Sequence, residues 1–111
     1  MSQRLPSHLE IGGLIRLAQT HGGNAMVLSK GERDAGTLLI VTMCRGKDTQ
    51  LLERMPQMDG TRPFVVTRVQ DHENPMEFPE YLDRRKRQDP DIWILEIDID
   101  DPQKLIALLP Q

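Results

Sequence analysis

The chain is poor in the features that would place it outside the cytoplasm. Cys44 is the only cysteine in 111 residues, so no intramolecular disulfide can form. Residues 1–6 lack the apolar run of a secretory signal peptide, and no apolar run in the chain comes near the ~20 residues of a transmembrane helix. These absences predict a protein of a reducing, cytoplasmic compartment.

Aromatic residues are also scarce, and acidic residues outnumber basic ones by 17 to 14. One Trp, one Tyr and two Phe leave the core to aliphatic residues and to six methionines, whose flexible side chains fill irregular gaps. The net charge of −3 argues against the sequence-independent affinity for nucleic acid that a basic protein gains from phosphates. The length predicts one domain, spanning residues 1–111.

The common motifs of catalysis and metal binding are missing. His8, His21 and His72 have no second ligand three or four residues away, and Cys44 has no C-x-x-C mate. The chain contains neither the G-x-S-x-G of a nucleophile elbow nor the G-x-x-x-x-G-K-[ST] of a phosphate-binding loop. The sequence therefore predicts no metal site, no cofactor and no catalytic residue.

What is present begins with an amphipathic helix. Ser7 and Glu10 have the S-x-x-E spacing in which a serine caps a helix and the glutamate bonds back to it, which predicts a helix over residues 7–21. Gly12 and Gly13 lie inside this helix, at a cost of about 1 kcal/mol each relative to alanine. We interpret them as a place where the helix packs closely on a sheet.

The rest of the chain alternates between strand and helix patterns. Residues 37–45 are apolar on both faces, which is typical of a central strand, and the polar residues 31–36 are expected to form a hairpin connection before it. Trp93, the only tryptophan, is expected to be buried against the first or last helix. Strands are predicted over residues 24–30, 37–45, 49–55, 64–69 and 92–99, and further helices over 79–88 and 102–109.

These elements predict an α+β fold in a single domain, in the order α-β-β-β-β-α-β-α. We expect a mostly antiparallel sheet of about five strands with the helices on one face.

Three segments are candidate functional sites. Backbone amides between Gly31 and Gly36 could hold an anion, with Arg33 and Asp34 as ligand-binding residues, although a plain turn explains the same residues. The last helix is unusually apolar for its length, so Leu105, Leu108 and Leu109 are candidate residues of a protein interface.

The third candidate is a basic cluster near the end of the second predicted helix. Its residues could contact RNA or a nucleoprotein, but acids in the same segment offset them. Basic residues in a last helical turn are also favoured by the helix dipole. The cluster consists of Arg84, Arg85, Lys86 and Arg87.

Two motifs carry a resemblance to a known family. Residues 31–36 read G-x-x-D-A-G, and residues 89–93 read D-P-D, a hydrophobic residue and W. With the amphipathic first helix and the glycine pair before a strand, the chain resembles the short alphaproteobacterial proteins of the domain of unknown function 1491. The resemblance implies no established activity and supplies no site residues.

Fold alone does not fix function, so three hypotheses stay open. The leading one is a non-catalytic binding or assembly module that self-associates as a homodimer. The second is a small enzyme acting on an anionic substrate beside residues 31–36. The third is an accessory protein that contacts RNA through the basic cluster.

Overall fold

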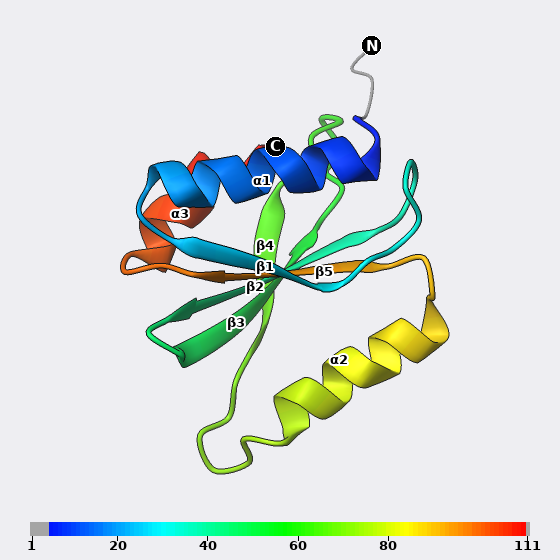
Figure 1. The fold of residues 1–111 in the computed structure, drawn as a ribbon. Coiled ribbons are helices and arrows are strands. Elements are labelled where there is room, and N and C mark those ends of the chain that lie inside the picture. Colours follow the sequence, from blue (N-terminus) through cyan, green and yellow to red (C-terminus); the bar gives the residue numbers. More distant parts are fainter. Residues whose placement is uncertain (1–4, 111) are drawn as a thin grey trace.

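The computed structural model describes residues 5–110 (Figure 1). Within them, three helices and five strands follow the order that the sequence predicts, which confirms the α+β class. The helices are α1 (Ser7–Thr20), α2 (Glu77–Gln88) and α3 (Pro102–Leu108). The strands are β1 (Asn24–Ser29), β2 (Leu38–Cys44), β3 (Lys47–Arg54), β4 (Phe64–Val69) and β5 (Trp93–Asp98).

The five strands form one mixed sheet in the order β1-β5-β2-β3-β4. β2 and β5 pair in parallel, and the other neighbouring pairs are antiparallel. β5 is buried on both faces along its first half, which suits a central position between β1 and β2. The expected hairpin between the strands that became β1 and β2 is therefore wrong, because residues 31–36 cross over the start of β5.

Helices cover both faces of the sheet, so the expectation of helices on one face is wrong (Figure 1). α1 and α3 lie on one face, over a core cluster that includes Leu52 and Leu95. α2 lies on the other face, where Phe78 joins a second cluster with Leu39 and Ile94. The central strands carry apolar side chains on both faces, so helices are needed on both faces to remove these side chains from water.

The loop of residues 31–36 ties α1 to the sheet. The helix begins at Ser7, but no side chain caps it, so the predicted serine cap is wrong. Instead the Ser7 hydroxyl donates to the Gly36 carbonyl at 2.7 Å. The amides of Ser7 and His8 donate to the carbonyls of Asp34 and Arg33, at 3.1 and 2.9 Å. The loop therefore satisfies amide groups that the first helical turn leaves without partners.

The same loop holds the start of β5. The Glu32 amide donates to the Asp91 carbonyl at 2.9 Å, and the indole N–H of Trp93 donates to the Glu32 carbonyl at 2.6 Å. A Cβ atom on Gly31 would lie 2.1 Å from the Asp91 oxygen, and one on Gly36 would lie 2.3 Å from it. Both glycines are thus needed for close approach of two backbone segments, and the two motifs of the family resemblance pack against each other.

Trp93 is buried as predicted. It is 4% exposed and shares its core cluster with Ile11 of α1 and Leu105 of α3. Its one polar atom is satisfied by Glu32, so the ring carries no unpaired donor into the core.

Candidate functional site

An apolar groove runs between α1 and α3. It has a volume of about 560 Å³, within the range of natural binding sites, and most of its lining is aliphatic. The exposed leucines at its margin are Leu5, Leu9 and Leu108, which are 59%, 51% and 46% exposed. We call this surface the α1–α3 groove, and its apolar lining includes Leu5, Leu9, Gly13, Leu17, Leu108 and Pro110.

The three candidate interface residues of the last helix divide between this groove and the core. Leu105 and Leu109 are 1% and 7% exposed and belong to the core cluster under α1 and α3. Leu108 points away from that core and lines the groove. Of the three, only Leu108 is accessible to a partner, and it faces residues of α1 that the sequence did not suggest as a site.

A partly buried ion pair lies at the polar end of the groove. The Glu10 carboxylate binds the guanidinium of Arg54, which also donates to the Arg62 carbonyl at 2.9 Å. The same guanidinium lies 4.4 Å from the centre of the Phe64 ring. Glu10 and Arg54 have side chains only 20% and 13% exposed, so each charge depends on the other for compensation.

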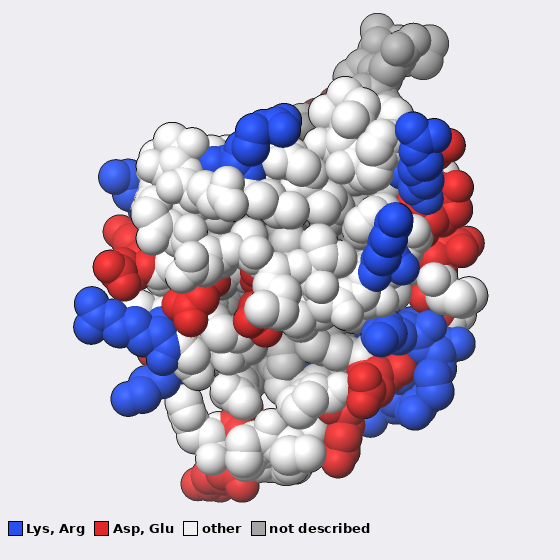
Figure 2. All heavy atoms as spheres, viewed as in Figure 1, with Lys and Arg blue, Asp and Glu red and all other residues white. Residues whose placement is uncertain are grey.

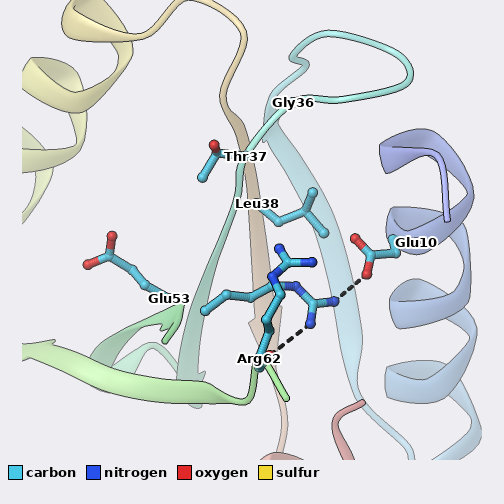
Figure 3. A pocket seen from close by; sticks show the side chains of 7 residues that line it. Glu10, Gly36, Thr37, Leu38, Glu53 and Arg62 are labelled. Atoms are coloured by element: carbon cyan, nitrogen blue, oxygen red, sulfur yellow. Dashed lines mark hydrogen bonds and ion pairs between the residues drawn. The ribbon is translucent and has the colours of Figure 1, made fainter. Parts of the chain in front are cut away.

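Figure 3 shows the small cavity beside this pair, where Glu10 and Arg62 converge and Glu53 points away from them. Its volume is about 80 Å³, enough for only a few water molecules. The lining includes Gly36 but neither Arg33 nor Asp34. The cavity therefore does not gather the residues that an enzyme beside residues 31–36 would use.

The amides of the 31–36 loop already have an anion. One carboxylate oxygen of Glu32 accepts from the amides of Asp34 and Ala35, at 2.8 and 2.5 Å. These bonds, Ala35 first, hold the pKa of the Glu32 carboxyl below its ordinary value of 4.5. Sequence reasoning offered an external anion here as the alternative to a plain turn, and it missed that the loop carries its own carboxylate.

The candidate ligand residues Arg33 and Asp34 lie on the exposed turn of this loop. His8 is the histidine nearest to them: its Nδ1 lies 3.1 Å from the Arg33 carbonyl oxygen and 3.9 Å from an Asp34 carboxylate oxygen. The structure brings Asp34 and His8 together at the surface, with the Arg33 backbone, and the contact helps to fix the loop on α1.

Glu32 gives the loop a pH dependence that can be measured. Because its folded pKa is lowered, its stabilising effect is present above the unfolded value near 4.5 and is lost as the pH falls through the folded value. We expect Glu32→Gln to melt at a lower temperature than the wild type at pH 7, and the gap to close in acid. Thermal melts of both proteins between pH 7 and pH 3 check this, and a gap that stays constant across that range contradicts it.

The basic cluster of α2 is divided between internal pairing and solvent. Arg85 binds the Glu53 carboxylate at 2.8 Å and donates to the Tyr81 hydroxyl at 2.9 Å. Arg84 lies with its guanidinium 5.7 Å from the Tyr81 ring centre, while Lys86 and Arg87 are exposed. Figure 2 shows basic and acidic atoms side by side on the right of the molecule, over the end of α2 and the loop above it. This view contains no continuous basic face.

Between residues 5 and 110, no three His, Cys, Asp or Glu side chains come together as a metal site. Asp98, an acid on the polar half of β5, instead accepts from the amides of Arg45 and Gly46 at 2.7 and 3.0 Å. In the same residues, no helix combines the length and the apolar character needed to cross a membrane.

Fold and site define a small α+β domain with a mixed sheet, an apolar groove on one face and internally paired polar clusters. A family model described as "Protein of unknown function (DUF1491)" matches residues 5–107, and the chain belongs to this family. No curated protein matches it.

Solved structures agree with the family assignment. A crystal structure of a DUF1491 family protein from Caulobacter crescentus CB15 has 29% identity and a TM-score of 0.78, covering 92% of this chain and 94% of that one. A solution structure of a protein from A. tumefaciens has 30% identity and a TM-score of 0.75, covering 98% of both chains. These descriptions name no activity, which agrees with the expectation that the family resemblance carries no established activity.

Proposed function

We propose that this chain is a non-catalytic assembly module whose binding surface is the α1–α3 groove. The observation that carries the proposal is the exposure of Leu5, Leu9 and Leu108 around one apolar groove. Contiguous exposed apolar surface on a soluble domain marks a binding site more often than scattered residues do. We include in the proposal a single domain spanning the chain and a bacterial, cytoplasmic setting, supported by the lone Cys44 and the bacterial relatives.

The groove suits an apolar helix of a protein partner. Its walls are helical, and an amphipathic helix fits between two helices by placing its apolar side chains in their groove. Arg16 lines the groove and, among residues 5–110, has no acidic partner. The partner helix is therefore expected to carry an acidic residue at the level of Arg16.

A second exposed apolar surface, on β1, is less suited to binding. Met26, Val27 and Leu28 lie on β1, at the edge of the sheet, and are 61%, 37% and 41% exposed. The register between Val27 and Ser29 is shifted, and a bulge of this kind discourages the pairing of a further strand. We therefore place the partner on α1 and α3.

The arrangement of the residues around the 31–36 loop does not support the enzyme hypothesis. Glu32 takes the amides that would hold an anion, and the cavity beneath the loop holds a satisfied ion pair. Ligand binding at Arg33 and Asp34 stays a prediction, as does RNA contact by the basic cluster of α2.

Photocrosslinking in the native cell tests the proposal. A benzophenone amino acid replaces Leu9 or Leu108 in the groove, or Met76 as a control, which is 62% exposed at the start of α2 on the other face. We expect adducts of protein mass at positions 9 and 108 and none at position 76. Absence of protein adducts at both groove positions, or equal adducts at all three, contradicts the proposal.

A further inference from the structure

We infer that the partner in the α1–α3 groove is a second copy of this chain, with its α1 antiparallel to the first and crossing it at Gly13. This inference rests on the proposed function, since it names the occupant of the same groove. It replaces the expectation that a homodimer forms mainly through α3, because Leu105 and Leu109 belong to the core.

The first argument is the glycine itself. Among residues 5–110, a Cβ atom added to Gly13 would meet no atom within 4 Å, so packing within the described part of the chain does not require glycine there. The expected close packing of this glycine on the sheet is therefore wrong. Yet a glycine inside a helix is unfavourable relative to alanine. Gly13 lines the groove, where a missing side chain lets another backbone come close.

The second argument is the pattern of residues around Gly13. Leu9 and Leu17 are each four residues from it, so Leu9, Gly13 and Leu17 form one ridge along the helix. Under a twofold axis at Gly13 that reverses the helix direction, Leu9 of one copy lies level with Leu17 of the other. Both line the groove, and the same surface meets itself as a twofold interface requires.

The third argument is charge. Glu10 and Arg16 are each three residues from Gly13, on opposite sides, so the same axis brings Arg16 of one copy level with Glu10 of the other, twice in the dimer. Arg16 is exposed and lacks an acidic partner among the described residues. The Glu10 carboxylate, already bound to Arg54, is 20% exposed and has further acceptor positions. A parallel arrangement would instead bring like charges level with each other.

Sedimentation velocity of the purified chain over a range of concentrations tests the inference. We expect a reversible dimer in the wild type, with a dissociation constant raised about tenfold or more by Gly13→Gln and severalfold by Arg16→Glu. Met76→Glu, at a site 62% exposed outside the groove, is expected to leave the dissociation constant unchanged. Gly13→Ala adds a second readout, because it should raise the melting temperature of the dilute monomer while weakening the dimer.

Two results overturn the inference. One is a wild-type chain that stays monomeric at several hundred micromolar, and the other is a dimer that Gly13→Gln and Arg16→Glu leave intact although both variants melt cooperatively. Either result leaves the proposed function standing if the crosslinks at Leu9 capture a different protein. If the crosslinks capture nothing, the proposed function fails separately.

Discussion

Replacing Trp93 with alanine is expected to cost about 3–5 kcal/mol of unfolding free energy, enough to unfold much of a domain of ordinary stability. The ring is 4% exposed and packs in the cluster that joins α1 and α3 to the sheet. Its removal also frees the Glu32 carbonyl, which accepts from the indole N–H at 2.6 Å. The loss therefore combines a cavity with a broken anchor of the 31–36 loop.

Urea unfolding followed by circular dichroism measures this change. Trp93→Phe serves as the control, because it keeps most of the ring volume and loses only the indole hydrogen bond. We expect Trp93→Phe to be less destabilised than Trp93→Ala. A Trp93→Ala protein that unfolds cooperatively within about 1 kcal/mol of the wild type would show that the core has been misassigned.

The second large effect is expected for Gly31→Ala. The new Cβ would lie 2.1 Å from the Asp91 oxygen and 2.6 Å from a backbone carbon of Ile92, so one of two backbone segments has to move. Overpacking of this kind costs about 1–3 kcal/mol, and here it also disturbs the bonds from the loop to α1 and Trp93.

The matched control is the same substitution at a glycine with free space. Among the described residues, a Cβ at position 13 meets no atom within 4 Å, so at a dilution where the chain is monomeric Gly13→Ala is expected to raise the melting temperature, whereas Gly31→Ala lowers it. Thermal melts of the two variants in parallel decide the matter. Equal melting temperatures would mean that the 31–36 loop does not press on Asp91 in solution.

The local elements could be predicted from the sequence because they follow short-range rules. The apolar alternation around Trp93 and the proline after Asp101 correctly predicted β5 and the start of α3, where Asp101 accepts from the Lys104 amide at 3.1 Å. β2 was correctly predicted as a central strand because it is apolar on both faces.

The arrangement of the elements could not be predicted, because long-range pairing decides it. Local spacing favoured a hairpin through residues 31–36, but β5, more than fifty residues later, inserts between β1 and β2. β2 and β5 are apolar on both faces, and such strands need helices on both faces of the sheet to bury them. The prediction of helices on one face overlooked this requirement. The bond from Glu32 to its own loop depends on that crossover and has no separate sequence signal.

The groove was only half visible in the sequence. The apolar last helix suggested an exposed surface, but its short length could not show that Leu108 would face outward while Leu105 and Leu109 entered the core. The sequence did contain one indication of the groove, Gly13. A glycine is unfavourable inside a helix, so its presence suggested that another segment packs closely there. Within the described residues, no atom lies within 4 Å of a Cβ placed on Gly13, so the close packing on the sheet that this signal suggested is absent.

The most direct test of self-assembly through the α1–α3 groove is the dilution dependence of the amide chemical shifts of the ¹⁵N-labelled chain. Between high and low micromolar concentration, we predict shifts for the amides around Gly13 of α1 and around Leu108 of α3, with those of α2 and β4 unchanged. A spectrum independent of concentration, or shifts confined to the sheet edges β1 and β4, would contradict the account.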